Sequence, residues 1–199
     1  MGFGRYGGGS FIGLHCDWDR RCSRSKYSVL LYDCQNDDRV RSEVLDQRES
    51  LTRAGYSLIL GLRDLYPAPL SDLNMVAMRI RTRVPTIGVR TYILLAVAEI
   101  EAWFIQDETH FARIDSALNV DTFSAKFGFN PRTQSAETVA HPSKLLHQIY
   151  SSVGKAYRKT RIHVERTVQV LDYAALCFTQ VQKLPHLRIL IAYLDGFFA

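Results

Sequence analysis

Three apolar segments in the first half of the chain each end in acidic residues. They span residues 27–32, 56–62 and 91–98, and weakly alternating segments of this kind are typical of strands buried on both faces. Segments with helical character follow each of them. Strands separated by helices favour parallel pairing with right-handed crossovers. The pattern therefore predicts an α/β fold with a mostly parallel sheet.

The segments between and after these strands have the spacing and end signals of helices. Asp37 or Asp38 is a suitable cap for a helix that ends before Gly55, and residues 70–83 place apolar residues at helical intervals before Pro85. Further helices are predicted at residues 141–150, 165–181 and 184–198. The last third of the chain is therefore expected to be mostly helical.

Length and composition limit the class of protein. A chain of 199 residues lies near the upper end of single-domain size. We expect a flexible or divergent N-terminal segment at residues 1–26, an α/β core at 27–125, and a helical extension packed on the core at 126–199. There is no apolar run of about 18 residues to cross a membrane, and four scattered cysteines form no disulfide framework. A cytoplasmic location is expected.

Basic residues are bunched, although the formal net charge of +5 is modest. The groups are Arg20, Arg21, Arg24 and Lys26; Arg79, Arg81 and Arg83; and Lys155, Arg158, Lys159 and Arg161. Such patches suit phosphate backbones, but for any one of them an ordinary solvated face is the favoured interpretation. They bear on function mainly in combination with an acidic site.

Acidic residues follow all three predicted strands. Asp33 and Asp37 follow the first, Asp64 the second, and Glu99 and Glu101 the third. Because the carboxyl ends of parallel strands share one edge of a sheet, these side chains are expected to converge there. Carboxylate oxygens are the ligands that Mg²⁺ and Mn²⁺ prefer. The sequence thus predicts a metal site; the alternative is that each acid caps its own helix or pairs with a neighbour such as Arg63.

Several of these segments together are similar to a known family. LLYDCQNDD, LGLRD, LAVAEIEAWFIQD, HPSKLL and YRK resemble the TOPRIM-like domains of unknown function of family 4276, over residues 27–159. The most specific piece is E-A-W-F, which begins at Glu101. That family is related to the TOPRIM nucleases that accompany ABC-type or OLD-type ATPases in bacterial anti-phage systems. The resemblance implies a sheet of about four strands flanked by helices, with Asp33 and either Glu101 or Glu99 as cation ligands.

The reaction that this resemblance implies is metal-assisted hydrolysis of a phosphodiester. A bound Mg²⁺ or Mn²⁺ would polarise a phosphoryl oxygen and lower the pKa of the attacking water. The carboxylates expected to hold the ion in this reaction are Asp33, Asp37 and Glu101. The cations expected to contact phosphate are Arg63, Lys144 and Lys159. Nucleic acid, an ATPase subunit and a second copy of the chain are the partners compatible with this hypothesis, and no membrane is involved.

Two departures from the family pattern support a different class of function. Gln35 stands where the family has a second Asp, and no Glu precedes Glu43. The absent early Glu favours a non-catalytic adaptor or sensor that binds an ATPase or nucleic acid through its helical third, whereas Asp33 and the Glu-x-Trp segment that begins at Glu101 disfavour it. Phosphotransfer to a small nucleotide is a third alternative. Acyl chemistry has little support, because Cys34 lies in an acidic turn that raises the pKa of its thiol.

Overall fold

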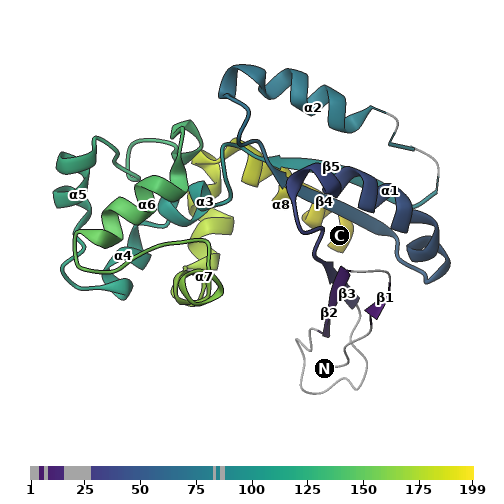
Figure 1. Cartoon of the computed structure of the whole chain (residues 1–199), viewed down its shortest axis with the longest axis horizontal. Helices are drawn as coiled ribbons and strands as arrows, with labels where there is room; N and C mark the ends of the chain where they lie inside the picture. The colour runs from purple at the N-terminus through teal and green to yellow at the C-terminus, as the bar shows by residue number, and fades with distance from the viewer. Residues whose placement is uncertain (1–4, 7–8, 16–27, 83, 86–87) are drawn as a thin grey trace.

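The computed structural model describes residues 5–6, 9–15, 28–82, 84–85 and 88–199, with side chains from residue 28 onward. The basic group at residues 20–26 and Arg83 lie outside these ranges. The strands are β1 (Arg5–Tyr6), β2 (Gly9–His15), β3 (Ser28–Tyr32), β4 (Leu58–Asp64) and β5 (Arg90–Ala96). The α-helices are α1 (Asp37–Arg53), α2 (Leu73–Arg81), α3 (Glu101–Gln106), α4 (Glu108–Ile114), α5 (Val120–Phe127), α6 (Pro142–Ser151), α7 (Arg161–Val168) and α8 (Pro185–Phe198) (Figure 1). None of the described helices has the length and apolar character needed to span a membrane.

The strands form two sheets. β4 and β5 pair in parallel, from Leu58 opposite Arg90 to Asp64 opposite Ala96. β3 pairs antiparallel with β2, which also pairs antiparallel with β1. Parallel pairing, predicted for three strands, is thus present for two, because β2 supplies the hydrogen-bond partner of β3. The strands β1 and β2 also lie in the segment that was expected to be flexible.

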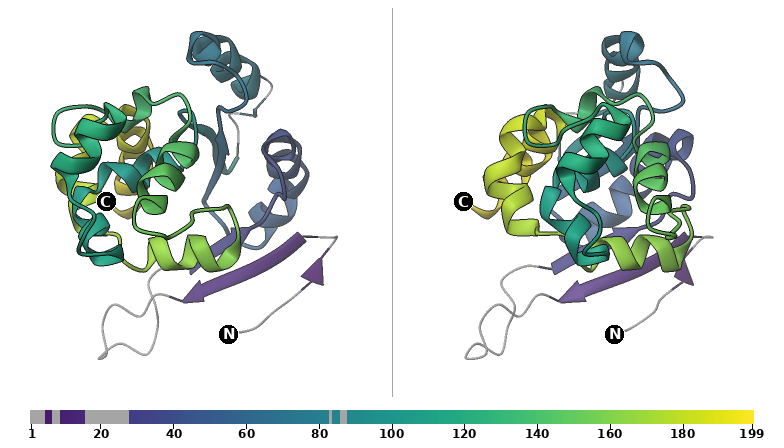
Figure 2. Two further views of the ribbon diagram at one scale, coloured as in Figure 1. Left: turned by 60° about the vertical axis from the view of Figure 1, so that its left-hand side comes forward. Right: turned by 90° about the vertical axis from the view of Figure 1, so that its left-hand side faces the viewer.

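Helices cover both faces of the β4–β5 sheet. Successive side chains of a strand point to opposite faces, so Ile59 and Ile93 join a buried cluster with α1 and α2, to which Val40 contributes. On the other face, the ring of Tyr92 lies 4.0 Å from that of Tyr193 in α8. Figure 2 shows α8 on one side of the sheet and α1 on the other. This layered part of the chain has the α/β character that the strand and helix pattern predicted.

The N-terminus of α1 differs in one detail from the sequence prediction. Asn36, rather than Asp37 or Asp38, is the N-cap, and its side chain accepts a hydrogen bond from the N–H of Arg39. The two aspartates occupy the first turn of the helix, where negative charge is favourable. Asp37 is thereby free to reach the next strand.

Gly61 allows α1 to lie close to the sheet. A Cβ atom at this position would lie 3.0 Å from a methyl group of Val40 and 3.0 Å from one of Val44. We expect Gly61→Ala to destabilise the protein by about 1–3 kcal/mol, because overpacking forces helix and strand apart. Urea denaturation beside Gly196→Ala, where a new Cβ meets nothing within 4 Å, measures the difference. Equal stability of both variants would contradict this close contact.

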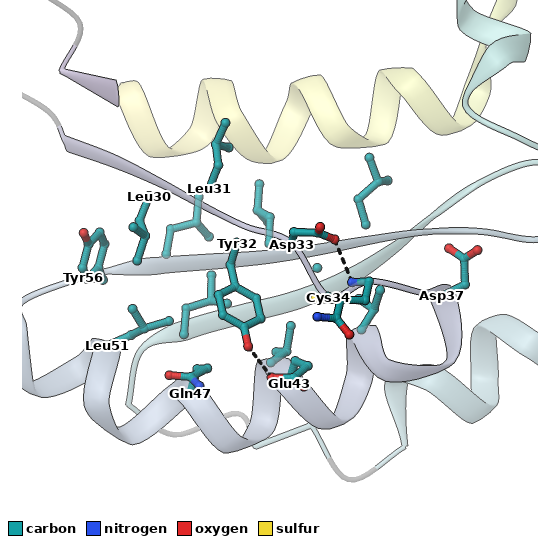
Figure 3. Close-up of a pocket in the computed structure, with 18 of the residues that line it drawn as sticks. Leu30, Leu31, Tyr32, Asp33, Cys34, Asp37, Glu43, Gln47, Leu51 and Tyr56 are labelled. Carbon is teal, nitrogen blue, oxygen red and sulfur yellow. Dashed lines mark hydrogen bonds between the residues drawn. The ribbon is translucent and has the colours of Figure 1, made fainter. Parts of the chain in front are cut away.

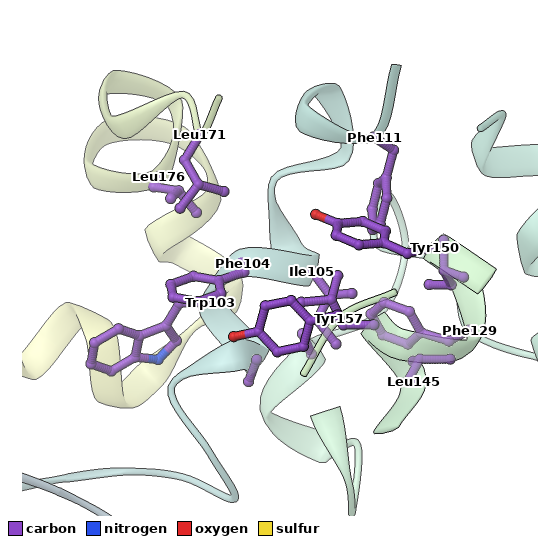
Figure 4. Packing of buried hydrophobic residues seen from close by; sticks show 14 of the residues in the cluster. Trp103, Phe104, Ile105, Phe111, Phe129, Leu145, Tyr150, Tyr157, Leu171 and Leu176 are labelled. Atoms are coloured by element: carbon purple, nitrogen blue, oxygen red, sulfur yellow. The ribbon is translucent and has the colours of Figure 1, made fainter. Parts of the chain in front are cut away.

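A second hydrophobic cluster occupies the helical part of the protein. It extends along the chain from Ala96 to Leu187 and includes the aromatic side chains of Trp103, Phe104, Phe111, Tyr150 and Tyr157 (Figure 4). Phe123 and Phe129 both belong to it. The boundary expected after residue 125 therefore falls inside this cluster, and helices α3–α5 pack with the C-terminal helices.

Trp103, the tryptophan of the E-A-W-F segment, has a structural partner in this cluster. Its indole N–H donates to the buried carboxylate of Glu137 at 3.2 Å. Glu137 also accepts hydrogen bonds from the backbone N–H groups of His186 and Leu187, in the first turn of α8. A buried carboxylate at a helix N-terminus is favourable. Glu137 thus links α3 to α8.

The long helix expected over residues 165–181 is interrupted. α7 ends at Val168, and a π-helical turn follows at Ala175–Thr179. Between them, the N–H of Asp172 donates to the buried carboxylate of Asp107 at 2.7 Å. This bond joins residues 65 positions apart, and it replaces the local bond that a continuous helix would make. The following helix, α8, agrees closely with its prediction.

His110 is fully buried among these helices. Its Nδ1 lies 2.6 Å from the carbonyl oxygen of Asp107, and its Nε2 lies 3.0 Å from the hydroxyl of Tyr150. Burial disfavours the charged ring and lowers its pKa from 6.5 to about 4. Between these values the unfolded chain binds a proton that the folded protein does not. The contribution of His110 to stability is therefore fully present above about pH 6.5 and is lost as the pH falls to about 4.

We expect the contribution of His110 to stability to fall on acidification through this window, by at most about 1.4 kcal/mol per pH unit. Asp64, whose pKa is raised to about 6, acts in the opposite direction below that pH. Urea denaturation across the window measures the loss, and side-chain NMR assigns it to the ring. An imidazole resonance of His110 that titrates near pH 6.5 in the folded protein would contradict the prediction.

Candidate functional site

Three carboxylates converge on one ammonium group at the carboxyl ends of β4 and β5. Nζ of Lys159 lies 2.9 Å from Oε1 of Glu99, 3.4 Å from Oε2 of Glu101 and 3.8 Å from Oδ2 of Asp64. The side chains of Glu99 and Glu101 are 5% and 3% exposed, whereas that of Lys159 is 50% exposed. We call these four residues the carboxylate cluster. It unites three of the five acidic residues predicted from sequence, and Lys159, expected at a phosphate, compensates their charge.

Hydrogen bonds orient the two glutamates. Ser143, in the first turn of α6, donates its N–H to Glu99 at 2.8 Å and its hydroxyl at 2.9 Å. Burial acts to raise the pKa of Glu99, but the hydrogen bonds from Lys159 and Ser143 outweigh it and hold the pKa below its ordinary value. The hydroxyl of Tyr157 donates to Oε1 of Glu101 at 2.9 Å. Both glutamate side chains are thus held in place.

Glu101 retains one buried oxygen without a hydrogen bond. Its Oε2 is inaccessible to solvent and has no hydrogen-bond partner among the described residues. The ammonium of Lys159, at 3.4 Å, meets its charge as an ion pair. A buried carboxylate oxygen of this kind has unused capacity to accept a donor or to coordinate a cation.

The surroundings of Asp64 act on its pKa in opposite directions. Burial and the charge of Asp37 raise its pKa to about 6, against the opposing effects of Lys159 and of the Ile100 N–H, which donates to it at 2.9 Å. Oδ1 of Asp37 in turn accepts a hydrogen bond from the N–H of Asp64 at 2.7 Å. The side chain of Asp37 therefore contacts the carboxylate cluster through the backbone N–H of Asp64. Ionisation of Asp64 above about pH 6 adds a negative charge to the cluster.

Two turns after strands contain non-glycine residues in the left-handed conformation. Gln35, in the turn after β3, has φ 68°, and Ala98, in the turn after β5, has φ 60°. This conformation is unfavourable for residues with a Cβ, and such strain tends to occur at functional sites. The carbonyl of Ala98 accepts a hydrogen bond from the N–H of Tyr66 at 2.8 Å. The turn that carries Glu99 is thus fixed to the turn that follows Asp64.

Asp33 lies apart from the carboxylate cluster. Its carboxylate accepts a hydrogen bond from the N–H of Gln35 at 2.7 Å. It also lines a cavity of about 550 Å³ between β3, α1 and β4 (Figure 3). Asp64, Glu99 and Glu101 do not line this cavity. The separation arises because β3 pairs with β2 and leaves the cavity between itself and β4.

The other predicted phosphate-binding cations have different surroundings. Arg63 is 14% exposed and forms an ion pair of 3.6 Å with Asp38. Lys144 is exposed on the first turn of α6. In the basic group that begins at Lys155, the ammonium of this residue donates to a backbone carbonyl at 2.6 Å and pairs with Asp115 at 3.3 Å. That group is therefore partly engaged within the protein.

The carboxylate cluster has the donor chemistry of a divalent-cation site. All its acidic ligand atoms are carboxylate oxygens, which suit Mg²⁺ and Mn²⁺, and one of them is buried without a hydrogen bond. As they lie, however, no three carboxylate, histidine or cysteine side chains in the described part of the chain form a group that could hold a metal ion. Lys159 lies among the three carboxylates. Coordination by all three would therefore require this ammonium to move away.

Sequence reasoning missed Ser143 and Tyr157. Their hydrogen bonds join them to Glu99 and Glu101 across 44 and 56 positions, so no local pattern predicts the pairing. A signal was nevertheless present, since both residues lie within HPSKLL and YRK, two of the segments that carry the family resemblance. The sequence predicts phosphate contacts for the lysines of these segments, whereas in the structure the neighbouring hydroxyl groups bind the carboxylates.

Comparison with known proteins identifies no relative of this chain. No protein-family model, curated protein or solved structure matches the chain. The function must therefore be inferred from the geometry of the site and from the sequence.

Proposed function

We propose that this chain is a TOPRIM-like, Mg²⁺- or Mn²⁺-dependent nuclease-like protein that cleaves phosphodiester bonds, acting with an ATPase partner in an anti-phage or mobile-element system. The observation that carries the proposal is the convergence of Asp64, Glu99 and Glu101 at the carboxyl edge of two parallel strands. Open α/β sheets bind their ligands at this edge. The converging residues also belong to the segments that resemble the TOPRIM-like family.

The proposal includes a TOPRIM-like sheet of about four strands, in which β3 docks beside β4. β3 and β4 face the same cavity, and Leu30 and Leu60 are among its apolar lining residues. Docking would bury this apolar surface, which is favourable. It would also bring Asp33 towards the edge where Asp64 lies, and Asp33 and Asp37 would then complete the predicted set of acidic ligands.

The residues at the carboxylate cluster would have different roles in this reaction. A bound divalent ion would polarise a phosphoryl oxygen and lower the pKa of a water molecule. Ser143 and Tyr157 hold Glu99 and Glu101 in place to receive it. Lys159, displaced from the carboxylates, would neutralise the charge of the phosphate. Its side chain is half exposed and can reach solvent.

A specific observation favours the second candidate, a non-catalytic adaptor or sensor. Lys159 already compensates the three carboxylates, as expected for a site that has lost its ion and kept its fold. In that case the acidic edge serves stability alone. The two candidates differ in whether a divalent ion binds and in whether phosphodiesters are cleaved.

A cleavage assay tests the proposal. The purified chain, with Mn²⁺ on plasmid DNA and on total RNA, is compared with Asp64→Asn and with Asp121→Asn, whose carboxylate is 74% exposed outside the cluster. We expect cleavage by the wild type and by Asp121→Asn, and a loss of about 100-fold in Asp64→Asn. Cleavage that Asp64→Asn leaves unchanged would contradict the proposal and point to a contaminating nuclease. Absence of cleavage together with absence of Mn²⁺ binding would favour the adaptor.

A further inference from the structure

Two aromatic rings lie on the loops that flank the carboxylate cluster. Tyr66 follows β4 directly after Asp64 and Leu65, and His141 immediately precedes α6, whose Ser143 binds Glu99. The two ring centroids are 5.8 Å apart and the ring planes meet at 77°. The tyrosine and the histidine thus form an edge-to-face pair beside the cluster, built from segments far apart in the sequence.

The Tyr66–His141 pair is exposed, in contrast to most aromatic residues of the second hydrophobic cluster, in the helical part of the protein. Tyr66 is 45% exposed and His141 is also exposed, whereas Phe111 and Tyr150 are fully buried. In an edge-to-face pair, the edge of one ring covers one face of the other, so each ring keeps at least one face that its partner leaves open. An exposed aromatic surface next to a charged site is a feature of ligand-binding surfaces.

The backbone around the pair is fixed. The N–H groups of Leu65 and Tyr66 donate to the carbonyls of Ala96 and Ala98 at 2.9 and 2.8 Å. The hydrogen bonds of Ser143 to Glu99 hold the start of α6, next to His141. The rings are therefore presented on anchored loops, which lowers the entropy lost when a ligand is bound.

We propose that Tyr66 and His141 form a stacking platform for an unpaired base of a single-stranded nucleic acid. Every nucleobase has a π-face, and aromatic side chains beside cationic ones are how proteins hold single strands. Lys144, exposed one turn further along α6, supplies a cation for an adjoining phosphate. In an intact duplex the base faces are stacked on their neighbours, so the platform selects unpaired nucleotides. This inference rests on the proposed function and names its substrate class.

Fluorescence anisotropy with two probes tests the platform. One probe is a short fluorescein-labelled oligothymidine, and the other has the same length and charge but abasic inner positions, so the two differ only in the bases. We expect the wild type to bind oligothymidine about tenfold more tightly than the abasic probe, since stacking contributes about 1–3 kcal/mol per base. The Tyr66→Ala, His141→Ala double variant is expected to bind both probes equally.

Matched variants separate stacking from folding. Tyr66→Phe keeps the ring and is expected to keep the preference for oligothymidine. Tyr173→Ala removes a 56% exposed tyrosine elsewhere and is expected to behave as the wild type. Circular dichroism verifies that each variant is folded. If the double variant fails to fold, the comparison of the two probes on the wild type still decides, because equal affinity for both overturns the proposal.

The remaining outcomes are equally decisive. A double variant that is folded and still prefers oligothymidine, or a wild type that binds neither probe, would overturn the platform. Mn²⁺ titration of the same proteins distinguishes this failure from failure of the proposed function. A protein that binds Mn²⁺ and cleaves nucleic acid without discriminating the probes lacks the platform and retains the function. A protein that discriminates the probes but binds no Mn²⁺ retains the platform and lacks the proposed chemistry.

Discussion

Replacing Lys159 with methionine is expected to destabilise the protein in EDTA and to strengthen its binding of Mn²⁺. The ammonium group is within ion-pair distance of Asp64, Glu99 and Glu101, two of which are almost fully buried. Without it the three carboxylates repel one another, which disfavours their charged forms and the folded state that holds them together. Because Lys159 is half exposed, we expect a loss of about 2 kcal/mol, below the range for a fully buried pair.

The same substitution removes the competitor of a divalent ion. In the wild type, Mn²⁺ must displace the ammonium from the carboxylates, whereas in Lys159→Met it does not. We expect Mn²⁺ to bind about tenfold more tightly or better, given the strength of charge interactions at such distances. Mn²⁺ should then raise the thermal stability of the variant more than that of the wild type.

Urea denaturation in EDTA and calorimetric titration with Mn²⁺ measure the two effects. Lys126→Met, which removes an exposed lysine from the end of α5, is the matched control and is expected to change neither. Destabilisation of Lys159→Met without any gain in Mn²⁺ affinity would contradict a cation site. That result would identify the cluster as a structural ion-pair network.

Glu101→Gln is expected to weaken Mn²⁺ binding by about 100-fold while leaving stability in EDTA unchanged or higher. The side-chain amide keeps an oxygen that can accept the hydrogen bond from Tyr157, so the geometry can be preserved. The substitution also removes one negative charge from a site where three carboxylates share one ammonium group. A residue that serves stability alone would instead destabilise the protein when its ion pair is broken.

The measurements for this variant are Mn²⁺ affinity, cleavage of nucleic acid and the free energy of unfolding in EDTA. Glu49→Gln, which changes an 83% exposed glutamate on α1, is the control and is expected to match the wild type in all three. Retained Mn²⁺ affinity in Glu101→Gln would rule out this carboxylate as a ligand. A large loss of stability in EDTA would assign it a structural role.

The fold could be predicted where one local pattern was sufficient. The apolar strands β4 and β5, the helix opened by Pro142 and the helix α8 follow from hydrophobic periodicity and end signals. The partner of β3 could not be predicted, since an apolar pattern does not specify which strand lies beside it. The expected burial of this strand on both faces was wrong, because β3 pairs with β2 and leaves side chains such as Val29 and Leu31 exposed. The interruption of the helix after α7 could not be predicted either, because it depends on a hydrogen bond between Asp107 and Asp172, which are far apart in the sequence.

Part of the site could also be predicted from local patterns. Acidic residues at the ends of β4 and β5 converge because parallel strands align their carboxyl ends, so Asp64, Glu99 and Glu101 lie together. The position of Lys159 among them depends on how the helical part packs against the sheet. No local pattern contains that information, so the ion pairs of Lys159 with these carboxylates could not be predicted from the sequence.

Calorimetric titration of the wild-type protein with Mn²⁺, beside Glu101→Gln and Glu49→Gln, tests the central claim most directly. It is carried out above pH 6, where Asp64 is mostly ionised. The account predicts saturable binding to the wild type and to Glu49→Gln, and its loss in Glu101→Gln. Absence of Mn²⁺ binding to the wild type, or equal binding to all three proteins, would contradict the claim that the carboxylate cluster is a divalent-cation site.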